Sequence, residues 1–96
     1  MFILNVSYSK SPEVVSEHAG THGEWVKKYI DAGIFVCAGP KSSKLGGVLI
    51  AKSIEESLLL KIIAEDSYVI ADVADYQITE FDCKLASNDF KILIGV

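Results

Sequence analysis

The sequence predicts an α+β fold of the ferredoxin-like type: a βαββαβ antiparallel sheet with two helices on one face, forming a single domain over residues 1–96. Two observations predict it. Apolar residues alternate with period two in some segments, which indicates strands, and recur at helical spacing in two others. The segments follow in the order strand, helix, strand, strand, helix, strand, so each helix connects two strands of the same sheet.

The first strand is predicted over residues 2–8, where alternate positions are apolar. The helix that follows is predicted to begin at Ser11-Pro12-Glu13. Serine is a favoured N-cap, proline fits the first helical position, and an acid complements the positive end of the helix dipole.

Gly20 and Gly23 interrupt the helical pattern of this first helix. We therefore expect an irregular turn near Ala19–Thr21, followed by a regular helix from about Thr21 to Ala32. Gly33 is the expected C-terminal cap of that helix, because glycine readily adopts the left-handed conformation that such caps need.

Two strands are predicted next, at Ile34–Ala38 and Gly46–Ala51, with Gly39-Pro40 closing the first of them. A second helix is predicted to begin at Ser53, which forms a capping box with Glu56, and to end near Glu65. The apolar positions expected to form its buried stripe are Ile54, Leu58 and Ile62.

The rest of the chain is predicted to form a short turn and two strands. Asp66-Ser67-Tyr68 begins a turn or a single helical turn. Asp75–Cys83 alternates with period two and is the fourth strand of the sheet. Phe90–Ile94 is apolar and follows turn-forming residues, so we expect an extra C-terminal strand there.

The composition excludes several classes of function. The net charge of −4 and the pI near 5.0 do not suit nucleic-acid binding, which needs a basic surface. No run of basic residues would bind acidic lipid, and the apolar stretch at residues 1–4 is too short for a signal peptide or a transmembrane helix. We therefore expect a cytoplasmic protein with no nucleic-acid or membrane partner.

Hydrophobic residues make up 50% of the chain and the mean hydropathy is +0.33, more than a monomer of 96 residues readily buries. Both faces of the predicted strands are largely apolar. We therefore expect the sheet face opposite the helices to be buried in a homodimer of the dimeric α+β barrel type. Cys37 and Cys83 lie in apolar strand segments, which predicts free, buried and unreactive thiols.

The two histidines of the chain, His18 and His22, are four residues apart. This is the spacing of a zinc-binding helix, but the glutamate of that motif is absent and no third ligand is indicated, so no metal site is expected. His22 precedes the apolar Trp25 by one helical turn and is expected to face the core side. It is a candidate general base, although a histidine bonded only to backbone fits the same pattern.

Asp66 is the best candidate for a carboxylate partner of His22, because its side chain is free to project from the turn after the second helix. A role as N-cap of the following turn is also open, and the two roles are compatible. We expect Trp25 or Tyr68 to roof a pocket for a small-molecule ligand and Gly39-Pro40 to form its floor. Such a dipeptide usually only ends a strand. No cofactor is predicted.

With these features in place, the sequence resembles the YCII-related (YciI-like) family from Phe2 to about Phe81. The matching features are the helical His22, Gly33 at the end of that helix, the strand ending in Ala38-Gly39-Pro40, the Gly46–Ile50 strand and Asp66-Ser67-Tyr68. The resemblance implies a ferredoxin-like fold, a dimer, and a pocket in which His22 and Asp66 form a pair.

The chain departs from the family's usual pattern at three places. Gly23 stands where a basic or bulky residue often follows the histidine, and the other two departures lie after the second helix. Asp-Pro-Phe is common where Asp66-Ser67-Tyr68 stands, and glycine is usual at the position of Asp72. Without the proline ring, Asp66 is expected to be less firmly placed.

The best-understood relative is a dehydrochlorinase that acts on a chlorinated hydroxyhydroquinone. The resemblance therefore implies a cofactor-independent lyase or isomerase acting on a small cyclic or aromatic substrate, with His22 as general base and Asp66 orienting it. The alternative is a non-catalytic dimeric module that binds a small ligand or a protein. A haem- or oxygen-using enzyme is a third option, for which only His18 and His22 could ligate iron.

Overall fold

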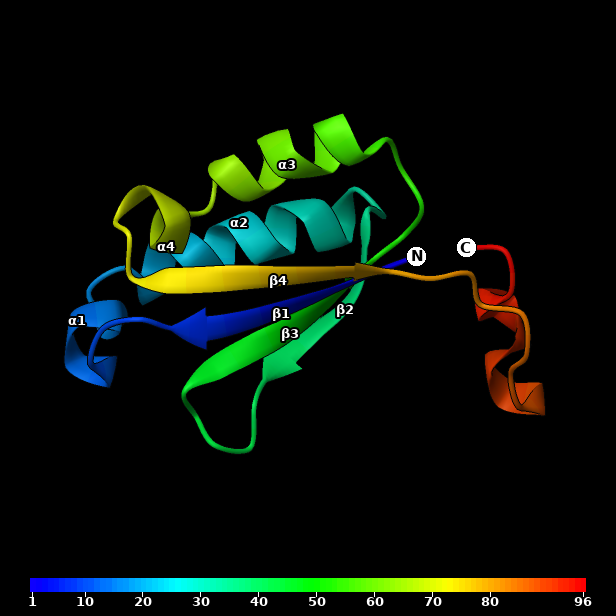
Figure 1. Ribbon diagram of the computed structural model, residues 1–96, viewed down its shortest axis with the longest axis horizontal. Helices are drawn as coiled ribbons and strands as arrows, with labels where there is room; N and C mark the ends of the chain where they lie inside the picture. The colour runs from blue at the N-terminus through cyan, green and yellow to red at the C-terminus, as the bar shows by residue number, and fades with distance from the viewer.

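The chain folds into the predicted α+β domain, and the computed structural model describes residues 1–96. Its elements are β1 (Phe2–Tyr8), α1 (Pro12–Ser16), α2 (Ala19–Asp31), β2 (Phe35–Pro40), β3 (Gly46–Ala51), α3 (Glu56–Ala64), α4 (Ser67–Ile70), β4 (Ala74–Glu80) and the 3₁₀ helix η1 (Asn88–Leu93). The four strands form one antiparallel sheet in the order β2-β3-β1-β4, and α2 and α3 lie over the same face (Figure 1). This is the ferredoxin-like arrangement that the order of elements predicted.

The hydrophobic core lies between the sheet and the helices. Phe2, Leu4 and Val6 of the central strand β1 are buried, as its period-two pattern predicted. Ala51 and Leu49 of β3 pair with Phe2 and Leu4 and are buried on the same face. Two neighbouring strands therefore present one continuous apolar surface to the helices.

The first helical segment begins where predicted but breaks earlier. Ser11 caps α1, with its side chain accepting a hydrogen bond from a backbone amide of the first turn. The break falls at Glu17 and His18 rather than near Ala19–Thr21, and Gly20 lies inside the first turn of α2. His18 has φ −111° and ψ 3°, outside helical geometry, so the interruption comes from this residue and not from a glycine.

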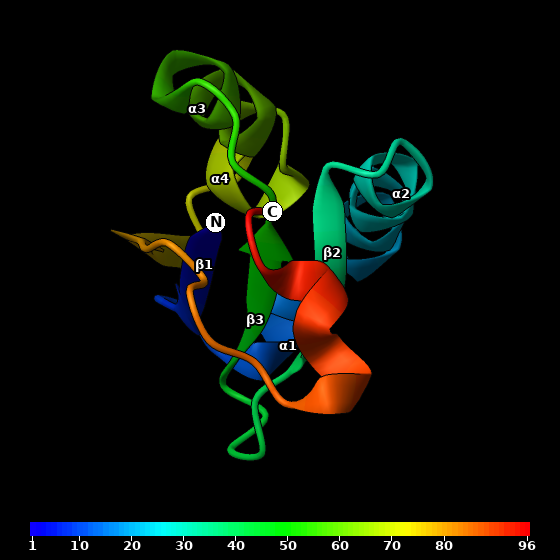
Figure 2. The ribbon, with the colours of Figure 1, turned by 90° about the vertical axis from the view of Figure 1, so that its right-hand side faces the viewer.

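The predicted cap at Gly33 is confirmed. Its φ is +76°, its N–H donates to the Ile30 carbonyl at 2.9 Å, and the N–H of Ile34 donates to the Tyr29 carbonyl at 3.0 Å. These two bonds satisfy carbonyls at the end of α2 and turn the chain sharply. The turn leads directly into β2, so that α2 runs beside β2 in the end-on view of Figure 2.

The predicted capping box at Ser53 is wrong. Helix α3 begins at Glu56 with Glu55 at the N-cap position, and the Ser53 hydroxyl instead accepts a 2.7 Å hydrogen bond from the amino group of Met1. A bond from a charged donor is stronger than a neutral cap, which explains the different partner. Of the predicted buried stripe, Ile62 is buried and Ile54 is partly buried against the core, but Leu58 is 45% exposed and Leu59 is fully buried instead.

The predicted C-terminal strand is wrong as well. Residues 81–96 leave the sheet after β4, and Phe90–Leu93 belong to η1 (Figure 2). Local bonds satisfy the backbone there: Phe90 N–H donates to the Ser87 carbonyl and Ile94 N–H to the Lys91 carbonyl. A strand needs a neighbouring sheet edge, and this segment projects beyond the end of the sheet, so short-range hydrogen bonds replace strand pairing.

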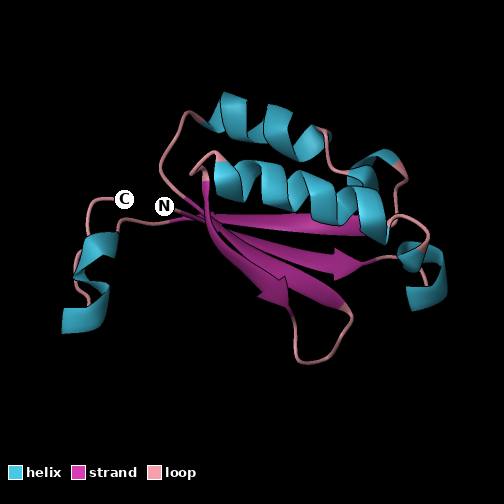
Figure 3. Cartoon of the chain, turned by 180° about the vertical axis from the view of Figure 1, so that it is seen from behind, coloured by secondary structure: helices cyan, strands magenta, loops and turns pink.

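The face of the sheet opposite α2 and α3 carries no helix (Figure 3). The register of the strands places on it the apolar side chains of Ile3, Cys37, Val48 and Ile50 and the polar side chains of Asn5, Asp75, Gln77 and Thr79. Its apolar part is therefore confined to β1, β2 and β3, while β4 alternates between polar and apolar residues.

The prediction of two buried cysteines is wrong. Cys37 is exposed, because it lies on the edge strand β2 and its neighbour across the sheet is Ile50 of the uncovered face. Cys83 is half-buried in the segment after β4. No helix of the chain is long and apolar enough to cross a lipid bilayer.

Candidate functional site

A cavity of about 550 Å³ lies between α2 and the strands β1, β2 and β3. Its wall on the α2 side consists of His22, Gly23, Val26, Lys27, Ile30 and Asp31. The rest of the lining consists of Val6 of β1, the rings of Tyr8 and Tyr68, and residues of β2 and β3, namely Ala38, Gly39, Pro40 and Gly46–Leu49. The volume is typical of a site for a small molecule, and the lining is mostly apolar.

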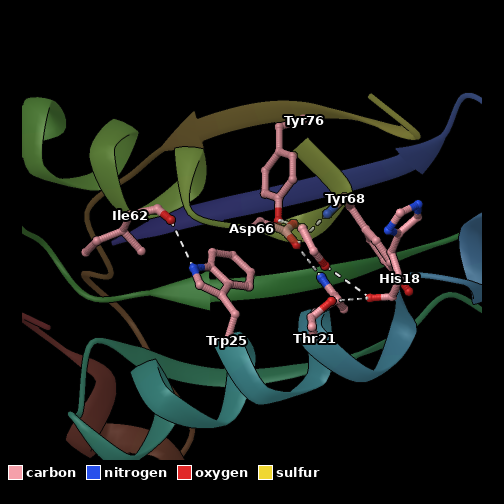
Figure 4. Close-up of polar contacts among 9 residues, drawn as sticks. His18, Thr21, Trp25, Ile62, Asp66, Tyr68 and Tyr76 are labelled. Atoms are coloured by element: carbon pink, nitrogen blue, oxygen red, sulfur yellow. Dashed lines mark hydrogen bonds and ion pairs between the residues drawn. The ribbon is translucent and has the colours of Figure 1, made fainter. Parts of the chain in front are cut away.

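Asp66 lies behind this cavity and is fully buried, with 0% of its surface exposed. The residue is the N-cap of α4, and its Oδ1 accepts a 3.0 Å hydrogen bond from the Tyr68 amide. Its Oδ2 accepts a 2.6 Å hydrogen bond from the hydroxyl of Tyr76 on β4 (Figure 4). A buried carboxylate is tolerated only when its oxygens are bonded, and these donors supply that condition.

His22 supplies the third donor to the same carboxylate. Its Nδ1 lies 2.7 Å from Oδ1 of Asp66, and the imidazole side chain is 20% exposed. The carboxylate can only accept, so Nδ1 carries the proton and the neutral ring has its lone pair on Nε2. Nε2 makes no hydrogen bond within the chain and is the ring nitrogen available to a molecule in the cavity.

Aromatic packing fixes the plane of this imidazole. The ring of Tyr68 stacks on His22 with centroids 3.8 Å apart and an angle of 4° between the planes. Tyr8 meets Tyr68 edge-on at 5.9 Å. Burial, followed by the nearby Tyr8, raises the pKa of Tyr68 to about 12, so its phenol stays neutral at physiological pH.

Tyr76 is a residue of the candidate site that the sequence did not reveal. Alternation along β4 placed it opposite Gln77 and Thr79, but a tyrosine on the core side of a strand usually indicates packing alone. Burial and then the hydrogen bond to Asp66 raise its pKa far above the ordinary value. The phenol of Tyr76 therefore keeps its proton at physiological pH and can donate it to the carboxylate.

Three of the four predicted ligand-contacting residues line the cavity, namely Gly39, Pro40 and Tyr68. Trp25 does not. Its indole N–H donates a 2.9 Å hydrogen bond to the Ile62 carbonyl of α3 (Figure 4), and its ring packs against Phe35 at 5.2 Å. The side chain is buried between α2 and α3, where a single large residue satisfies its polar atom and fills the core.

The expectation that Asp66 would be loosely placed without a following proline is wrong. Ser67 takes the first position of α4, and its hydroxyl donates to the His18 carbonyl at 3.0 Å. Thr21 Oγ1 donates to the same carbonyl at 3.1 Å (Figure 4). Because both hydroxyls bond the His18 carbonyl, α4 is fixed to the start of α2. The position of Asp66 relative to His22 is fixed by the same bonds. Asp72 follows α4 with φ +56° and takes the left-handed position that glycine favours.

The formal charges in the cavity lining are few. Lys27 and Asp31 form a 2.7 Å ion pair with each other, and both side chains are largely exposed. His18 and His22 belong to no group of three or more His, Cys, Asp or Glu side chains placed to hold a metal ion. The lining thus combines an apolar surface with one imidazole held by a carboxylate.

Comparison with models of known protein families gives a match. The family model of the YCII-related domain matches residues 1–82, which include every residue of the cavity, Asp66 and Tyr76. The segment that contains η1 lies outside the matched residues. No curated protein matches the chain.

Proposed function

The chain belongs to the YCII-related domain family, and from this premise we propose that it is a cofactor-independent lyase or isomerase in which His22 transfers a proton. The observation that carries the proposal is the hydrogen bond of 2.7 Å between His22 Nδ1 and Asp66, beside a cavity of about 550 Å³. A carboxylate behind an imidazole sets its tautomer and stabilises the ring when it becomes charged.

In the proposed reaction His22 Nε2 removes a proton from an activated carbon of the substrate. In a lyase reaction the electron pair of that C–H bond forms a new C=C bond, and the leaving group departs with the electron pair of its own bond. In an isomerisation the imidazolium returns the proton to a different carbon. Asp66 and Tyr76 stay in place throughout, because the carboxylate positions and stabilises the ring and the phenol holds the carboxylate.

The lining indicates the class of substrate. Apolar side chains line most of a cavity of about 550 Å³, and Lys27 and Asp31 neutralise each other. A substrate with a strong charge would therefore lose hydration without gaining a partner. We propose a small, uncharged, cyclic or aromatic molecule.

The proposal is tested with small chlorinated cyclic ketones and phenols in deuterated water. The readouts are the release of chloride and the incorporation of deuterium at carbon. We expect His22→Gln to reduce either rate by about 10²–10⁴-fold, the usual contribution of a general base. His18→Gln is the matched control and keeps the rate. Equal rates in wild type and His22→Gln would contradict the proposal.

A non-catalytic ligand-binding module is the second candidate, favoured by the mostly apolar lining with a single imidazole. In that case the same compounds bind without turnover, and His22→Gln lowers their affinity and changes no rate. The deuterium readout separates the two candidates, because binding alone exchanges no carbon-bound proton.

We further propose that the chain forms a homodimer through the uncovered sheet face. Ile3, Val48 and Ile50 form an apolar group on that face, next to the exposed Cys37. Apolar side chains in contiguous positions are usually covered in the functional protein, and a second copy of the same face is self-complementary.

A further inference from the structure

Gly23 lies in the interior of α2, beyond its first turn, where glycine destabilises a helix relative to alanine. Glycine is usually needed in a fold for a positive φ or for a close approach of another chain segment. Neither reason applies here. Gly23 has ordinary helical geometry, and a Cβ atom at this position would meet nothing within 4 Å. The fold therefore does not explain the glycine.

The cavity does explain it. One face of α2 lines the cavity with residues at helical spacing, in the order Gly23, Val26, Lys27, Ile30 and Asp31. Every position except the first carries a side chain. Because side chains on a helix lean toward its N-terminus, a side chain at position 23 would extend along the cavity wall toward the His22 end.

Two glycines of strand β3 that line the cavity have a steric explanation. A Cβ on Gly46 would lie 2.0 Å from the Val6 carbonyl oxygen, and one on Gly47 would lie 3.1 Å from the Gly39 carbonyl oxygen. Close pairing of the strands thus accounts for Gly46 and Gly47. Gly39 also lines the cavity and has nothing within 4 Å of a Cβ, so Gly23 and Gly39 are the two lining glycines without a steric cause, and Gly23 is the one on the helical wall beside His22.

We infer that Gly23 is a specificity-determining residue, which keeps space beside His22 for an uncharged ring compound larger than a single ring. This inference rests on the proposed function, in that the cavity is the substrate site. Its test, however, measures binding and does not require turnover.

The test compares Gly23→Leu with Gly20→Leu, the same change one turn earlier in α2. Gly20 also has nothing within 4 Å of a Cβ but does not line the cavity. Phenol and 2-naphthol serve as probes of one and two rings, and their affinities are measured from amide chemical shifts. We expect Gly23→Leu to weaken 2-naphthol at least about tenfold more than phenol, and Gly20→Leu to leave both affinities within about threefold of wild type. Gly23→Ala provides a second variant that is expected to melt at a higher temperature than wild type while binding 2-naphthol more weakly.

Unchanged 2-naphthol affinity in Gly23→Leu and Gly23→Ala, an equal loss in Gly20→Leu, or no binding of either probe to wild type would overturn the inference. Failure of the proposed function has a different signature. If His22→Gln leaves every proton-transfer rate unchanged while the size selection at Gly23 persists, the cavity selects ligands by size without the proposed chemistry.

Discussion

The hydroxyl of Tyr76 donates a 2.6 Å hydrogen bond to Oδ2 of Asp66, leaving Oδ1 to His22 and to the Tyr68 amide. Strand β4 thereby reaches the carboxylate from the side opposite α2. Hydrogen-bond donors on both oxygens prevent the carboxylate from rotating, so its orientation is set before any ligand enters the cavity. This relationship leads to the first of four predictions.

Tyr76→Phe is expected to lower the free energy of unfolding by about 1.5–3 kcal/mol, because a buried carboxylate loses one of its three donors. Urea denaturation measures the change. Tyr29→Phe is the matched control: its hydroxyl also bonds a carboxylate, that of Glu65 at 2.6 Å, but Glu65 is 45% exposed and water can replace the donor. A loss in Tyr29→Phe as large as that in Tyr76→Phe would contradict the prediction.

Asp66→Ala is expected to destabilise the protein by about 3 kcal/mol or more, because it leaves buried donors without an acceptor and removes the cap of α4. Asp66→Asn retains an acceptor oxygen and is expected to lose only about 1 kcal/mol. The same variant is expected to lose most proton-transfer activity, since an amide does not balance a charged imidazole. Denaturation and the rate assay together check both parts. An Asn variant as unstable as the Ala variant would show that charge, rather than hydrogen-bonding capacity, holds the fold at this position.

Stability is expected to fall at alkaline pH. The pKa of Tyr68 is raised to about 12 in the folded protein, mainly by burial, and that of Tyr76 is raised further by burial and the bond to Asp66. The folded protein thus holds both protons more tightly than the unfolded chain, whose tyrosines titrate near about pH 10. This contribution to stability is complete below about pH 10 and is lost as the pH rises through the folded pKa values.

Denaturation at successive pH values measures this loss, and near-ultraviolet absorbance follows the ionisation of the tyrosines. In Tyr76→Phe the decline in stability above about pH 10 is expected to be shallower, because one of the two groups is absent. A free energy of unfolding that stays constant from about pH 10 to pH 12 would contradict the prediction.

Reactivity of Cys37 is expected to report the proposed dimer. In the single chain Cys37 is exposed, and it lies opposite Ile50 on the uncovered sheet face. Wild type is expected to be a dimer in light scattering, with Cys37 reacting slowly with thiol reagents. Ile50→Glu is expected to give a monomer in which Cys37 reacts several-fold faster. Ile70→Glu is the control, because Ile70 is 73% exposed on α4, away from that face. Light scattering that shows a wild-type monomer at micromolar concentration would contradict the dimer.

The sheet was predictable because alternation is a strong local signal. The register of β1 against β3 places Phe2 and Leu4 with Ala51 and Leu49, as their periodicity requires. The buried face of α3 was predicted correctly at Ile62 but not at Leu58. Three consecutive leucines allow more than one buried stripe, and a shift of one residue rotates the helix by a quarter turn or more.

The candidate site was predictable only where a residue has a local signal. Asp66 follows a helix and precedes a short one, which is the position of a cap, and His22 lies one turn before Trp25. Tyr76 has no such signal, because its partner is ten positions earlier on another element. The exposure of Cys37 likewise depends on which strand is at the edge of the sheet, and an apolar run such as Phe35–Ala38 does not contain that information.

Asp66 both caps helix α4 and bonds His22, and these two roles constrain which substitutions the protein can tolerate during evolution. A substitution of Asp66 that abolishes the proposed reaction also lowers the fraction of folded chains, so cellular quality control removes more of the variant. Replacing His22 also removes one donor from the buried carboxylate, but it leaves the cap bond from the Tyr68 amide in place, so its cost in stability is expected to be smaller than that of losing Asp66. Descendants that abandon the chemistry are therefore expected to lose the histidine first and to keep the aspartate.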